Sequence, residues 1–128
     1  MNRPDQRLSR HQRLTYSRYF REAYDQRCNR VGRCMVLWLR RGEGASLRLG
    51  VVASKKVGNA VHRARARRIL REAYRRNRHL FSGSYDVVIV ARRALLSAKW
   101  DDVVAELLRL ADGIGLMAES PSKIENDN

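Results

Sequence analysis

The chain has 128 residues, enough for one domain of ordinary size and too few for two. It carries 27 Lys and Arg against 13 Asp and Glu, a formal net charge of +14, so its expected partner is a polyanion. No apolar run approaches the ~20 residues of a membrane-spanning helix, the Arg-rich N-terminus lacks the apolar core of an export signal, and two cysteines exclude a disulfide framework. We therefore expect a cytoplasmic protein with no metal or cofactor of its own.

The first predicted element is a helix over residues 14–27, where apolar side chains recur every three or four positions. Most of the side chains in this apolar stripe are aromatic. Two short runs rich in strand formers follow, residues 34–40 and 47–54, with a glycine-rich turn between them. This arrangement predicts an antiparallel hairpin, and it leaves open one more short strand nearby.

Residues 85–91 form a nearly continuous β-branched run, which predicts a strand buried on both faces. A last helix is expected from about residue 97 to Gly113, and residues 114–128 are expected to be a loose tail. With a basic helix between the second and third strands, the order is helix, strand, strand, helix, strand, helix. The predicted fold is an α+β two-layer sandwich, with residues 1–113 as its single domain.

The basic helix carries most of the functional information. Residues 55–79 contain ten Lys or Arg and one acid, Glu72, and they follow a Gly-Asn turn. Four arginines share one flank at i, i+4 spacing: Arg63, Arg67, Arg71 and Arg75. Because like charges at this spacing weaken an isolated helix, the flank favours a phosphate-binding surface over a merely solvated one. Guanidinium groups hold phosphate through fixed pairs of donors, which favours nucleic acid over an anionic membrane surface.

The aromatic side chains have two interpretations. Phe20 and Tyr24 lie one helical turn apart, and Trp38 belongs to a strand that can face them. Such residues usually pack in a core, but beside a basic helix they can also stack on unpaired bases. Both interpretations stay open at this point.

Catalysis by the protein itself is disfavoured. From residue 45 to residue 85 the only acid is Glu72, so this region offers no carboxylate cluster to hold the metal ions of a nuclease. A DNA-recognition helix is also less favoured, because such helices usually present Asn, Gln or Ser to base edges beside their arginines. The sequence thus predicts an RNA-binding protein without a catalytic centre.

The run RLGVVASKKVGNAVHRARARRILREAY, residues 48–74, resembles the signature of the protein subunit of bacterial ribonuclease P. That signature joins a strand to KK-x-G-N-A and then to an R-N-R helix, whose middle Asn is here Ala64. The segments FREAY, residues 20–24, and YDVVIVARRALL, residues 85–96, are similar to flanking parts of the family pattern. The resemblance covers about residues 7–112.

The resemblance implies an accessory role in removing the 5′ leader of precursor tRNA. The cleavage chemistry would belong to a large RNA subunit that uses Mg²⁺, while the protein binds that RNA and the single-stranded leader, raising substrate affinity and aiding metal binding. The resemblance also implies a left-handed strand–helix–strand crossover, the rarer hand. The alternative is a ribosomal or chaperone-type RNA-binding protein, which would be indifferent to the leader.

The resemblance also implies two groups of binding residues. The leader cleft is expected to comprise Phe20, Tyr24, Val36, Trp38, Val52 and Ser54, with Arg63, Arg67 and Arg71 at its edge. The surface for the catalytic RNA is expected to comprise Lys55, Lys56, Asn59, Arg65 and Arg68. Val52 stands where relatives often have Ser or Thr, so a hydroxyl contact to the leader is expected to be missing.

Overall fold

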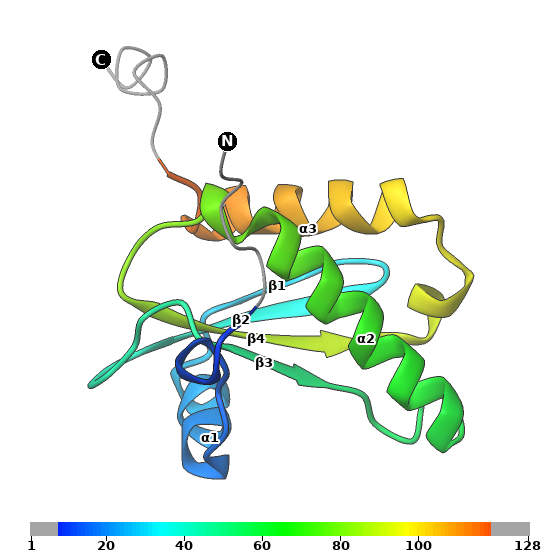
Figure 1. The fold of residues 1–128 in the computed structure, drawn as a ribbon, viewed down its shortest axis with the longest axis horizontal. Helices are drawn as coiled ribbons and strands as arrows, with labels where there is room; N and C mark the ends of the chain where they lie inside the picture. Colours follow the sequence, from blue (N-terminus) through cyan, green and yellow to red (C-terminus); the bar gives the residue numbers. More distant parts are fainter. Residues whose placement is uncertain (1–7, 119–128) are drawn as a thin grey trace.

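The computed structural model describes residues 8–118, which form a four-stranded mixed sheet with helices on both faces (Figure 1). The elements are α1 (Ser17–Gln26), β1 (Asn29–Val31), β2 (Met35–Arg41), β3 (Leu49–Val52), α2 (Ala60–Asn77), β4 (Tyr85–Ala91) and α3 (Trp100–Ile114). Short 3₁₀ turns cover Arg10–Gln12, Arg78–Leu80 and Arg93–Ser97. The predicted α+β class is confirmed. No helix in the described range is long and apolar enough to span a membrane.

The order of strands in the sheet is β1-β2-β4-β3, so the predicted hairpin between residues 34–40 and 47–54 is wrong. β4 lies between β2 and β3, antiparallel to the first and parallel to the second. The short additional strand, β1, forms the actual hairpin with β2. The physical reason is burial, because β4 is the most continuously buried strand, and the central position gives it a hydrogen-bonded neighbour on both edges and helices over both faces.

Alternation along the strands divides the sheet into two faces. Leu37 of β2 and Ile89 of β4 are opposite each other and fully buried on the face covered by α2 and α3. Ala66, Leu70 and Ala73 supply the matching stripe of α2. This face holds the main core and leaves the other side of α2 in solvent.

On the other face, a buried ion-pair network connects α1 to the sheet. Asp86 of β4 is completely buried, and its Oδ2 accepts from Nη1 of Arg40 and Nη2 of Arg48, each at 2.8 Å. Arg40 also donates from Nε to Glu22 of α1 at 2.8 Å. The guanidinium carbons of Arg40 and Arg48 lie 4.2 and 4.6 Å from the ring centroid of Tyr19, also on α1. The network thereby sets where α1 crosses the sheet.

The prediction of a loose C-terminal tail from residue 114 places its start too early in the chain. Gly115 ends α3 in the left-handed conformation, and the chain then runs back beside the segment that precedes β4. Leu116 is fully buried, its carbonyl accepts from the Ser82 N–H at 2.8 Å, and Met117 forms a bridge with Phe81. Residues 114–118 therefore belong to the packed domain, because Leu116 and Met117 return to the core after the helix cap. The rest of the expected tail lies outside the described residues.

Candidate nucleic-acid interface

The sheet face that carries α1 is only partly covered, because α1 is the single helix on that side (Figure 1). Half-buried apolar and aromatic side chains remain around the helix. We call this set the aromatic face: Phe20, Tyr24, Val36, Trp38, Val52 and Val90. Three strands and one helix contribute to it, so segments distant in sequence form a single surface.

The rings of the aromatic face are held in place by packing. Tyr24 and Trp38 meet edge to face, with ring centroids 5.0 Å apart. Phe20 lies so close to Gly50 of β3 that a Cβ there would overlap the ring. Burial raises the pKa of the Tyr24 phenol. Because these rings are neither fully buried nor fully exposed, each combines packing on one side with access from the other.

A basic hollow of about 900 Å³ lies at the carboxyl ends of β3 and β4. Its cationic lining residues come from two segments: Lys55 and Lys56 after β3, and Arg92 and Arg93 after β4. Ser54 and Val90 also line it, and Val90 belongs to the aromatic face as well. No acidic side chain is among the lining residues, so the hollow extends the apolar surface with positive charge.

Sequence reasoning missed Val90, Arg92 and Arg93 as members of this surface. The register of β3 and β4 pairs Val52 with Val90, and this pairing carries the two strand ends to one edge of the sheet. The sequence signal was a pair of arginines directly after a buried strand. That signal becomes informative only when β3 and β4 are known to be parallel neighbours.

The amino end of α2 is shaped by the predicted Gly-Asn turn. Asn59 caps the helix, and its side-chain oxygen accepts from the backbone N–H of His62 at 2.9 Å. Gly58 adopts φ of +148°, and a Cβ there would come 2.8 Å from the His62 ring. Lys55, Lys56 and Asn59 are all exposed around this turn. An exposed, cation-rich helix amino terminus is a favourable place for a phosphate group.

Charge compensation divides the arginines of α2 into two groups. Near the carboxyl end, Glu72 pairs with Arg75 at 2.7 Å and with Arg76 at 3.0 Å. The remaining arginines have no ion pair with any carboxylate in residues 8–118: Arg63, Arg65, Arg67, Arg68 and Arg71. The predicted phosphate-binding residues are thus the uncompensated ones, with Arg75 the exception in the flank.

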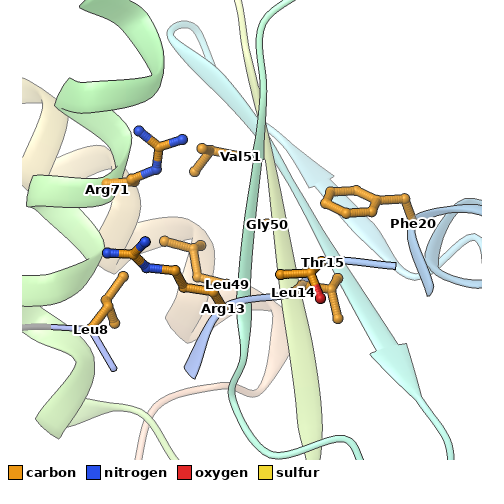
Figure 2. Close-up of a pocket in the computed structure, with 9 residues that line it drawn as sticks. All are labelled: Leu8, Arg13, Leu14, Thr15, Phe20, Leu49, Gly50, Val51 and Arg71. Carbon is orange, nitrogen blue, oxygen red and sulfur yellow. The ribbon is translucent and has the colours of Figure 1, made fainter. Parts of the chain in front are cut away.

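The predicted basic residues occupy different sides of α2. Arg65 and Arg68 are exposed on the outer side of the helix. Arg63 is half-buried, and its Nε is enclosed without a hydrogen-bond partner in the described part of the chain. Arg71 lies beside β3, whereas Phe20 lies on the opposite side of that strand (Figure 2). The structure therefore places Arg71 at the border of the aromatic face, across the edge strand.

No arrangement for metal catalysis is found in the described range. Residues 8–118 contain no group of three or more His, Cys, Asp or Glu side chains placed to hold a metal ion. The side chains of this surface are suited to stacking on bases and to contacting phosphate groups.

Known proteins are similar to this chain in sequence and fold. Residues 8–115 match the family model described as Ribonuclease P. The ribonuclease P protein component of Alkaliphilus oremlandii is 30% identical over 105 residues, covering 82% of this chain and 92% of the relative. That of Lachnoclostridium phytofermentans is 34% identical over 98 residues, covering 77% and 84% of the two chains.

Solved structures agree in fold. The Staphylococcus aureus RNase P protein superposes with a TM-score of 0.70 at 21% identity, covering 84% of this chain and 98% of the other. The Thermotoga maritima RNase P protein superposes with a TM-score of 0.65 at 26% identity, covering 77% and 93%. With the match of the family model across most of its length, the chain belongs to the ribonuclease P protein family.

Proposed function

We propose that this protein binds both the catalytic RNA of ribonuclease P and the single-stranded 5′ leader of precursor tRNA. The observation that supports the proposal best is the continuity of the aromatic face with the basic hollow through Val90. A single strand has unpaired bases and a charged backbone, and this surface offers partners for both. A duplex hides its bases and would make little use of Tyr24 or Trp38.

The uncompensated arginines support a second RNA contact. Arg65 and Arg68 point away from the sheet, so they can meet a different RNA from the one on the aromatic face. The catalytic RNA would carry out cleavage with Mg²⁺, and the protein would hold the substrate beside it. The expected gain is in substrate affinity, since the described residues supply binding groups rather than a metal cluster.

The test of this role is a cleavage assay at low Mg²⁺. A bacterial ribonuclease P RNA would be mixed with precursor tRNA, with and without the protein, and the rate of 5′ cleavage measured. We expect the protein to accelerate cleavage, and the acceleration to increase with the length of the leader. A folded protein that gives no acceleration with a cognate RNA would support the general RNA-binding alternative instead.

Replacing Tyr24 with Ala should weaken the binding of leader-bearing tRNA by about 1–3 kcal/mol, the range for loss of one stacked base. Binding of mature tRNA should be unchanged, because it lacks the strand that occupies the aromatic face. Dissociation constants for the two tRNAs, each measured with the assembled holoenzyme, would check this result.

Two variants separate stacking from folding. Tyr24→Phe keeps the ring and should retain most of the affinity. Trp100→Ala removes an exposed aromatic side chain on α3, away from the aromatic face, and should not change the leader effect. Equal losses for leader-bearing and mature tRNA with Tyr24→Ala would assign Tyr24 to the core alone.

A further inference from the structure

A second hollow, of about 200 Å³, lies at the outer edge of β3, which we call the edge hollow. Its polar side chains are Arg13, Thr15 and Arg71, and Phe20 and Gly50 also line it. Figure 2 shows Arg13 and Arg71 on the α2 side of β3, with Phe20 on the opposite side. At ~30 Å³ per water molecule in the liquid, the volume is enough for a phosphate group and its immediate surroundings.

The segment that carries Arg13 is fixed to β3. Arg13 forms a parallel bridge with Leu49, and the Leu14 N–H donates to the Leu49 carbonyl at 2.8 Å. Leu14 is buried against the underside of α1. The guanidinium of Arg13 is therefore delivered to the edge hollow by ordered backbone, although the side chain itself is exposed.

The edge hollow has uncompensated positive charge. Partial desolvation lowers the pKa of Arg71, and the nearby guanidinium groups of Arg13 and Arg67 lower it further. None of these three arginines has an ion pair with a carboxylate among the described residues. An anion between Arg13 and Arg71 would replace this mutual repulsion with attraction.

Gly50 brings Phe20 to the edge of the sheet. The absence of a Cβ lets Phe20 rest directly on the strand, and a Cβ there would also approach Leu14 Cβ at 3.4 Å. A base stacked on Phe20 therefore lies beside the edge of the sheet rather than over its centre. The next phosphate along the leader RNA can then reach the side of β3 where Arg71 lies.

We propose that the edge hollow binds a phosphate of the leader strand through Arg13 and Arg71, where that strand leaves the aromatic face. This inference rests on the proposed leader-binding function and adds a path to it. The leader enters at the basic hollow, passes over Val90, Val52 and Phe20, crosses the edge of β3 beside the Phe20 ring, and ends at the edge hollow. Arg13 is the new element, contributed by a segment outside the basic helix.

The test uses holoenzyme and a series of leaders that lengthen by one nucleotide. With the unchanged protein, affinity should rise with leader length and then level off. The Arg13→Ala and Arg71→Ala variants should follow the same curve for short leaders and lose only the last increment. We expect a loss of about three- to tenfold, because an exposed charged contact contributes less than a buried one.

A neutral-backbone substrate tests the same contact from the RNA side. A methylphosphonate linkage would be placed at each leader position in turn, which removes one negative charge at a time. One distal linkage should weaken binding to the unchanged protein and have no further effect on Arg13→Ala. Arg10→Ala is the matched control, since Arg10 is an exposed arginine in the same segment that does not line the edge hollow.

The outcomes separate this inference from the function on which it rests. Losses that are equal at every leader length, or that appear in binding of the catalytic RNA alone, would overturn it and assign the edge hollow to that RNA. Unchanged curves for both variants would also overturn it while leaving leader binding intact. If the unchanged protein shows no leader dependence at all, the proposed function itself fails.

Discussion

Replacing Asp86 with Ala is expected to lower the free energy of unfolding by about 3–5 kcal/mol, the usual cost of breaking a buried ion pair from one side. Asp86 is fully buried and accepts from both Arg40 and Arg48, so its removal leaves the buried guanidinium of Arg40 without its innermost partner. Urea unfolding at neutral pH would measure the loss. Because Tyr19 and Glu22 of α1 contact the same arginines, leader affinity should fall with stability.

Glu22→Ala provides the matched control within this network. Its side chain is 45% exposed where it meets Arg40, so its removal should cost only about 0–1 kcal/mol. A loss with Asp86→Ala no larger than that of Glu22→Ala would show that the buried cluster contributes little to the fold.

The stability of the protein at acid pH tests the same ion pairs of Asp86. Burial acts to raise the pKa of Asp86, but hydrogen bonds from Arg48, the Ser46 N–H and Arg40 outweigh it and hold the pKa below its usual value. A carboxyl with a depressed folded-state pKa contributes stability that is present above its unfolded pKa, about 3.9. That stability disappears as the pH falls through the folded-state pKa. The free energy of unfolding of the unchanged protein should fall by this contribution in acid. The Asp86→Asn variant should lack this decrease, because its side chain does not titrate.

The second large effect concerns RNA affinity. Changing Arg63, Arg67 and Arg71 together to Ala should weaken leader-bearing tRNA binding by about 10- to 100-fold at moderate salt. It should also flatten the dependence of log affinity on log salt by up to ~0.7 per lost contact with a single strand, or ~2 in all. Titrations over a range of salt concentrations would measure both quantities. An unchanged slope would mean that no phosphate lies against this flank.

Arg75 and Arg76 allow a control on the same helix. Both guanidinium groups already contact Glu72, whose carboxylate offsets one of the two positive charges that the Ala substitutions remove. We expect a much smaller change in salt dependence for this pair than for the uncompensated arginines. A similar flattening for both variants would point to net charge alone rather than to located phosphate contacts.

The sequence predicts the helices and strands well because their signals are local. Apolar spacing located α2 and α3, and the β-branched run at residues 85–91 coincides with β4. Strand order was not predictable in the same way, because alternation reports which faces are buried and says nothing about the neighbouring strand. The predicted hairpin failed for this reason, as β4 enters between strands that are adjacent in sequence.

The residues of the binding surface differ in the same way. Some are placed by local periodicity, and others by contacts between segments that are distant in sequence. Phe20 and Tyr24 were predicted to share a helix face, because helix periodicity specifies it, and Trp38 was assigned to a strand that could face them. The structure brings Tyr24 and Trp38 into contact. Arg92 and Arg93 were missed because their place depends on the parallel pairing of β3 with β4. Arg13 was missed because a bridge to Leu49 carries it to the site from outside any predicted element. The contacts of all these residues with RNA stay predictions.

The uneven compensation along α2 has a kinetic consequence. The arginines without an ion pair in the described residues begin one turn after Asn59, at the positive end of the helix dipole, whereas Glu72 offsets part of the charge toward the other end. In the field of an RNA, such a helix experiences a torque that turns its amino end toward the phosphates before contact occurs. Protein molecules that approach in another orientation are therefore turned before contact, which raises the association rate constant. This rate constant should fall as added salt screens the charges that produce the torque.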